Sequence, residues 1–175
     1  MSSISSEASH PPIPTRRVVT GHTPSGNSII VEDEPIPPRP FNGTPSFFTD
    51  LYWTDKSVPD NDVEFKDLAK EHPHELIGPE GSSLKVVWLP PGQVSPFHRT
   101  VTLDYGIVMQ GSITLILDDN KRVVLHPGDV IVQRGTIHAW KNEGTEWTKV
   151  YFIVFPSQKV KIGDKELETE FRKLE

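Results

Sequence analysis

Two histidines and one acidic residue carry most of the chemistry that the sequence offers. His98 and Asp104 lie in the segment from Gly92 to Gly111, and His138 lies in the segment from Pro127 to Asn142. An imidazole near a carboxylate can act as a general base or acid at neutral pH. Two histidines and a carboxylate are also a ligand set for Fe(II) or a catalytic zinc ion. The chain has no cysteine, so any metal ligand must be His, Asp or Glu.

The spacing of the first segment predicts that its polar side chains share one face. Successive side chains of a strand point to opposite faces, which groups His98, Thr100, Thr102 and Asp104. Inside a barrel such a polar set is costly unless it lines a ligand cavity. The alternative interpretation is that His98 and Asp104 bond neighbouring backbone groups or lie on an exposed face.

The elements around these residues indicate a β-protein. From Leu84 to Phe155 the chain is a series of short β-rich segments separated by Pro-Gly, Asp-Asp-Asn, Pro-Gly-Asp and Asn-Glu-Gly turns. No amphipathic helix separates these segments, which favours an antiparallel sandwich or barrel over a parallel sheet.

The flanking regions predict further elements. We expect a disordered tail over residues 1–14, a hairpin from 16–22 and 27–34, an extended Pro-rich edge over 35–40 and a strand over 45–54. Residues 61–71 predict a short helix or an ordered loop. In residues 163–175, Leu167, Phe171 and Leu174 have helical spacing behind a capping Asp164, which predicts a C-terminal helix.

The two segments resemble the motifs of the cupin superfamily. In the first motif, five residues separate Gly92 from His98, and six separate Asp104 from Gly111. Thr100 stands where the family has a second histidine, and Asp104 where it has a glutamate. The second motif is matched by Gly128, Gly135, His138 and Asn142, with one residue fewer before Gly135.

This resemblance implies an all-β fold, the cupin double-stranded β-helix or jelly-roll barrel, with the predicted C-terminal helix added. The implied boundaries are a tail over 1–14, N-terminal strands and linker over 15–83, a cupin core over 84–156 and a C-terminal helix over 157–175. The chain looks like small single-domain cupins of fungi and bacteria. Fungal members of that group lie in polyketide biosynthetic clusters, as dehydratases, cyclases or oxidoreductases.

The resemblance also implies that His98, Asp104 and His138 would hold any divalent metal, such as Fe, Mn, Ni or Zn. A Thr hydroxyl is a poor ligand, and Asp104 is one methylene shorter than the usual glutamate. We therefore favour a metal-independent dehydratase or cyclase that uses the three residues as an acid–base cluster and needs no cofactor. The alternatives are a metal-dependent oxidoreductase and a non-catalytic barrel that only binds a ligand.

Several neighbours fit the walls of a cavity for a flat, moderately apolar substrate. Trp140 shares the parity of His138, and Arg134 lies in a turn at the expected barrel mouth. The other predicted substrate contacts are Thr100, Trp88, Met109, Tyr52 and Trp53. For the aromatic residues, ordinary core packing is the competing interpretation. Arg99 lies on the opposite face from His98, where we expect either a structural role or an ion pair at the rim.

Composition and charge limit the kinds of binding partner and the cellular location that we expect for this protein. The net charge of -6 and the scattered Lys and Arg residues argue against a nucleic-acid surface. No apolar run approaches the length of a membrane-spanning helix, and the N-terminus lacks the apolar core of a signal peptide. We therefore expect a cytoplasmic protein that acts on a small molecule. We also expect a homodimer, in which the N-terminal strands extend a neighbour's sheet.

Overall fold

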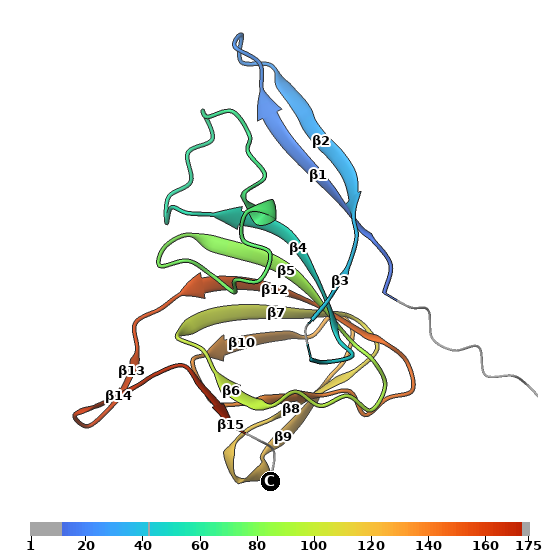
Figure 1. Ribbon diagram of the computed structural model, residues 1–175, viewed down its shortest axis with the longest axis vertical. Coiled ribbons are helices and arrows are strands. Elements are labelled where there is room, and N and C mark those ends of the chain that lie inside the picture. The colour runs from blue at the N-terminus through green and yellow to red at the C-terminus, as the bar shows by residue number, and fades with distance from the viewer. Residues whose placement is uncertain (1–11, 42, 173–175) are drawn as a thin grey trace, which may run out of the picture.

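The fold is built from two β-layers that face each other, with a long hairpin projecting from one end (Figure 1). The computed structural model describes residues 12–41 and 43–172. Of the tail predicted over residues 1–14, residues 1–11 lie outside the described range. Strands account for nearly all regular structure within these residues, as the sequence predicts.

The larger sheet has six strands in the order β10-β7-β12-β5-β4-β3. Its members are β3 (Arg39–Pro40), β4 (Phe47–Thr54), β5 (Ser82–Leu89), β7 (Thr102–Gln110), β10 (Val130–Arg134) and β12 (Thr148–Pro156). All its pairings are antiparallel. Along β7 the side chains alternate between buried positions, such as Asp104 and Val108, and more exposed ones, such as Tyr105. This period of two is what a strand with one face on a core requires.

The second layer consists of two smaller groups of strands. They are β15-β6 and β11-β8-β9, formed by β6 (Phe97–Arg99), β8 (Ile113–Ile116), β9 (Arg122–Leu125), β11 (Ala139–Lys141) and β15 (Glu170–Arg172). Isolated bridges between His98 and His138 and between Val94 and Lys141 join the groups. The main core lies between the layers, where Val108 and Val150 of the large sheet pack with Leu115 and Trp140 of the second.

The chain crosses between the layers at Thr100 and Val101, so β6 and β7 are not one strand. The predicted single strand through His98 and Asp104 is therefore interrupted by a corner. The expected common face is nevertheless kept, because both residues turn toward the space between the layers. His98 shares a face with His138 across their bridge, and Asp104 alternates into the core side of β7.

The turn between β7 and β8 explains one glycine of the motif. Gly111 has φ +67, and a Cβ there would lie 2.8 Å from the backbone oxygen of Trp147. A left-handed φ and the lack of space both favour glycine at this position.

The predicted N-terminal hairpin is present as β1 (Thr15–His22) and β2 (Ser28–Ile36). It projects from the two sheets (Figure 1). Arg17 holds the base of the hairpin. Its buried guanidinium donates to the Leu51 carbonyl oxygen at 3.0 Å and to Asp67 at 2.7 and 2.9 Å.

The sequence predicts either a short helix or an ordered loop for residues 61–71. The structure shows an ordered loop that contains one 3-10 turn, η1 (Leu68–Lys70). A second 3-10 turn, η2 (Asp118–Asn120), connects β8 to β9.

The predicted C-terminal helix is wrong within the described residues. The segment forms the hairpin β13 (Val160–Ile162) and β14 (Lys165–Leu167), followed by β15. Leu174 of the expected helical stripe lies outside the described residues. An isolated short helix is marginal in water, whereas β15 gains backbone hydrogen bonds on the free edge of β6. Tertiary pairing therefore overrides the local helical spacing.

Candidate functional site

His98 and His138 are brought together by backbone pairing. Each donates its backbone N–H to the other's carbonyl oxygen, at 2.8 and 2.9 Å. Because directly opposed residues of an antiparallel pair share a face, the two imidazoles lie side by side, with ring centroids 4.3 Å apart. Thirty-nine residues separate the two histidines in the chain, so this pair exists only through the fold.

Local hydrogen bonds orient both rings in the same way. Nδ1 of His98 lies 3.0 Å from the carbonyl oxygen of Pro96, and Nδ1 of His138 lies 2.9 Å from that of Thr136. A carbonyl only accepts, so in the neutral ring Nδ1 carries the proton and Nε2 keeps its lone pair. The arrangement therefore presents two Nε2 atoms that can accept a proton.

Burial keeps these imidazoles neutral. The pKa of His138 falls to about 4, first because burial disfavours the charged form and then because His98 is close by. Burial also lowers the pKa of His98, although the Pro96 carbonyl partly opposes this. At neutral pH both rings are bases rather than acids.

Asp104 enters from the facing sheet. Burial raises the pKa of its carboxyl to about 6, and the neighbouring Thr102 hydroxyl acts weakly in the opposite direction. Its Oδ1 is buried and has no hydrogen-bond partner among the described residues. A buried oxygen without a partner is costly, and protonation or a bound ligand reduces that cost. Asp104 is therefore the acid of the group.

Thr100 lies at the corner between β6 and β7. Its hydroxyl is 2.7 Å from that of Thr102, which is buried. Thr100 is thus bonded to a second threonine, and Thr102 links it toward Asp104. Trp140 lies beside His138 with ring centroids 5.4 Å apart, as the shared parity predicts.

The structure places the other predicted wall residues elsewhere. Trp88 pairs with Lys149, on the face of the large sheet that turns away from the second layer. Tyr52 is exposed on the same outer side, and Trp53 is buried against His72, with Nε1 donating to Asp55 at 2.6 Å. Trp88 and Trp53 thus follow the core-packing interpretation, whereas Tyr52 stays exposed and stacks on Phe65, with ring centroids 6.4 Å apart.

Met109 and Arg134 also lie away from the histidines. Met109 is 54% exposed on the outer side of β7, because Val108 takes the inward position. Arg134 is exposed and pairs with Leu103, which places it on the outer face as well. Both side chains therefore point away from the core, because they occupy outward positions of their strands. Arg99 forms the expected ion pair, with Glu170 at 3.0 Å.

A residue that the sequence reasoning missed is Phe171. It pairs with His98 across β6 and β15, and the two ring centroids are 6.0 Å apart. The helical spacing assigned Phe171 to a helix, so no sequence pattern pointed to this contact.

The predicted metal ligands do not converge in this structure. The donor atoms of His98, Asp104 and His138 do not all lie within 4.8 Å of one another; among the described residues, that spacing is met by Glu32, Glu34 and Asp67. Two histidines and one aspartate have the right chemistry for a metal, but this geometry does not fit a three-ligand cage.

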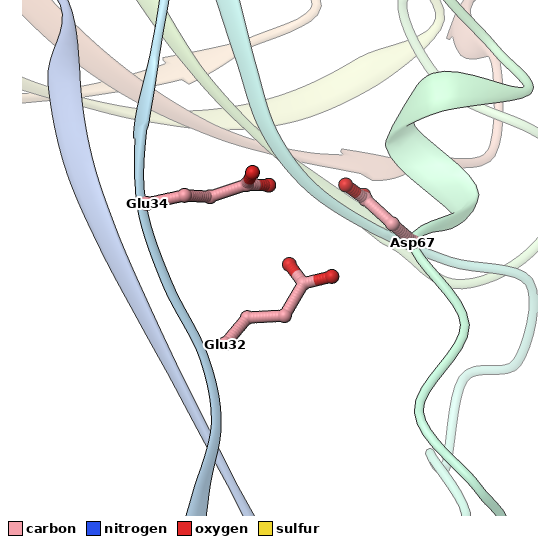
Figure 2. Close-up of side chains that lie close together, drawn as sticks. All are labelled: Glu32, Glu34 and Asp67. Carbon is pink, nitrogen blue, oxygen red and sulfur yellow. The ribbon is translucent and has the colours of Figure 1, made fainter.

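Figure 2 shows the carboxylates of Glu32, Glu34 and Asp67 pointing toward one another. The guanidinium of Arg17 bonds all three, and Lys70 pairs with Glu34 and Asp67. Two cations thus bridge the three carboxylates and offset most of their charge, which makes the group an ion-pair network at the hairpin base. A cleft of about 1190 Å³ nearby lies between the hairpin and residues 52–68, away from the histidines.

Comparison with known proteins defines the family. A family model described as a cupin domain matches residues 85–155. Phomopsin biosynthesis cluster protein D of Diaporthe leptostromiformis is 34% identical over 156 residues, which cover 85% of this chain and 82% of that protein. The chain belongs to the cupin family. This cupin is also 31% identical to the cupin-domain-containing oxidoreductase virC of Hypocrea virens, over 86% of this chain and 80% of that protein.

Solved structures support the cupin fold. The Cnp3 cupin domain of Schizosaccharomyces pombe aligns with a TM-score of 0.50 and 14% identity, covering 81% of this chain and 88% of that one. A double-stranded β-helix protein from Klebsiella pneumoniae gives 0.50 and 18%, covering 78% and 90%. The described part of this cupin contains no helix that is long and apolar enough to cross a bilayer.

Proposed function

We propose that this cupin is a small-molecule enzyme of secondary metabolism that removes water from a β-hydroxy ketone, or closes a ring by the same proton transfers. The observations that carry the proposal are the two neutral imidazoles lying side by side on one layer and the buried carboxyl on the core side of the opposite layer. His98 and His138 present Nε2 atoms from one layer, and Asp104 presents an unpartnered Oδ1 from the other. The relatives named for biosynthesis clusters support the metabolic class.

The assigned roles follow from burial. Nε2 of His98, the less buried of the two rings, accepts the proton from the carbon next to the ketone. The electron pair of that C–H bond forms the new double bond as the C–O bond breaks. Asp104 gives its proton to the departing hydroxyl, which leaves as water. His138 has too low a pKa to be the acid, so we assign it to hydrogen bonding beside His98.

A fused bicyclic β-hydroxy ketone, 3-hydroxy-1-tetralone, provides a direct assay because loss of water gives fluorescent 1-naphthol. We expect purified protein to accelerate this elimination above the buffer rate. His98→Gln and Asp104→Asn should each lower kcat by about 100-fold, the usual contribution of a positioned acid or base. The matched control is His22→Gln, because His22 is exposed on the hairpin.

Dependence on pH is a second readout of the same assay. Because the reaction needs protonated Asp104, kcat/KM should fall as the pH rises above about 6. Full turnover by folded His98→Gln and Asp104→Asn proteins would exclude the acid–base roles.

The names of several relatives favour a second candidate, a metal-dependent oxidoreductase. Elemental analysis of the purified protein, before and after dialysis against a chelator, separates the two. We expect elimination activity to survive chelation. Stoichiometric Fe, Mn, Ni or Zn, together with an activity that chelation abolishes and the metal restores, would support the oxidoreductase instead.

A further inference from the structure

The C-terminal strand places an exposed aromatic ring at the edge of the proposed site. Phe171 is 70% exposed, although a phenyl ring normally gains free energy from burial. Its ring is nearly parallel to that of His98, with an angle of 12° between the planes. Since β15 pairs with β6 and His98 pairs with His138, all three rings lie on one face of the second layer.

Neighbouring contacts fix Phe171 in this position. Glu170 accepts a hydrogen bond from the buried Arg99 at 3.0 Å and also pairs with Arg172. The register matches Glu170 with Arg99, Phe171 with His98 and Arg172 with Phe97. The strand is therefore anchored on both sides of Phe171, so the ring's position is set by the fold.

The rings form a continuous row from the surface to the core. The centroid separations are 6.0 Å from Phe171 to His98, 4.3 Å from His98 to His138 and 5.4 Å from His138 to Trp140. Exposure falls from 70% at Phe171 to 3% at His138 and 7% at Trp140. The inner members are covered by protein, whereas the outer ring has a free surface that an aromatic ligand can cover.

We propose that Phe171 is a specificity-determining residue, whose exposed ring stacks against a neutral, planar aromatic or conjugated ring of the substrate beside His98. The charged residues of the strand are paired, because Glu170 bonds both Arg99 and Arg172. The row thus offers ring faces rather than a charged group. This inference rests on the proposed function, because it names the substrate class of the same site.

Binding without turnover tests it. The probe is 1-naphthol, titrated into the protein while the His98 and His138 ring protons are followed by NMR. We expect saturable shifts at His98 in the parent protein, and a similar affinity in Phe171→Tyr, which keeps the ring. Phe171→Leu should bind 1-naphthol about tenfold more weakly. The saturated analogue 1-decalol should bind Phe171→Leu and the parent protein with equal affinity.

The matched control is Phe41→Leu, which removes another exposed ring, stacked on Phe48 at 4.5 Å, and should leave the affinity unchanged. Circular dichroism checks that each variant folds. Equal affinity of Phe171→Leu and the parent, or no shift at His98, would overturn the inference. Sedimentation data in which Phe171→Leu dissociates a dimer would also overturn it, since a second copy would then cover the ring. Because no turnover is measured, these outcomes are independent of the acid–base test.

Discussion

Burial acts in opposite directions on Asp104 and on the two histidines. It raises the pKa of the carboxyl and lowers the pKa of each imidazole, because in every case the charged form is disfavoured. One environment thus yields a protonated acid and two neutral bases within the same narrow pH range. Divergent pKa values of this kind are typical of acid–base sites.

The stability of an Asp104→Asn variant tests the burial of this carboxyl. The ordinary pKa is 3.8, and the folded value is about 6, so between these values the folded state binds more protons than the unfolded state. Ionisation of Asp104 therefore destabilises the parent as the pH rises from about 4 to 6, by on the order of 3 kcal/mol in total. Asparagine does not ionise, so the stability of the variant relative to the parent should rise over this window.

Urea unfolding of both proteins at several pH values across the window measures this difference. The histidine contributions are common to both proteins and cancel in the comparison. A stability difference that stays constant with pH would mean that Asp104 titrates normally.

At the scale of elements, two peripheral segments are held by buried arginines. Arg99 anchors β15 through Glu170, and Arg17 joins the hairpin to Asp67 and to the carbonyl oxygen of Leu51. A two-stranded hairpin alone is marginally stable in water. The Arg17 network therefore contributes to the ordering of β1 and β2 on the rest of the fold.

Replacing Arg17 by leucine should release the hairpin. The change leaves Asp67 and Glu32 without their guanidinium partner, and loss of one member of a buried ion pair costs about 3 kcal/mol. We expect faster amide hydrogen exchange in residues 15–36 and a lower Tm. Arg16→Leu is the control, because its ion pair with Asp33 is exposed and should contribute little. Unchanged amide hydrogen exchange in the Arg17→Leu variant would show that Arg17 does not hold the hairpin on the rest of the fold.

At the scale of the whole molecule, the outer face of the large sheet is markedly apolar. Tyr105 and Met109 on β7 and Val130 and Val132 on β10 are exposed together, with Val132 directly paired to Tyr105. The projecting hairpin also carries exposed apolar side chains, Val18 and Ile30. Contiguous apolar surface of this kind is typical of interaction faces. The homodimer expected from the sequence, in which the N-terminal strands extend a neighbour's sheet, stays a prediction. We propose that its interface also includes this apolar face.

A charge on the face should therefore dissociate the dimer. We expect the parent to sediment as a dimer and Val132→Lys as a monomer, because desolvating a lysine within an apolar interface is costly. Val123→Lys is the control, since Val123 is equally apolar but lies on β9 in the other layer. A monomeric parent protein would refute the prediction.

The sequence by itself determined the all-β architecture, the N-terminal hairpin and the inward direction of His98, Asp104, His138 and Trp140. These follow from local properties, since strand alternation and turn residues act over a few positions. The cupin motif spacing was visible for the same reason.

The tertiary structure alone decided which groups meet. It opposed His98 to His138, turned Trp88 to the outer face, and made a strand of the segment carrying Phe171. Each outcome depends on a partner distant in the chain, above all the free edge of β6 that the C-terminal segment pairs with. Local spacing carries no information on such pairings, and backbone hydrogen bonds to a distant strand outweigh a weak helical preference.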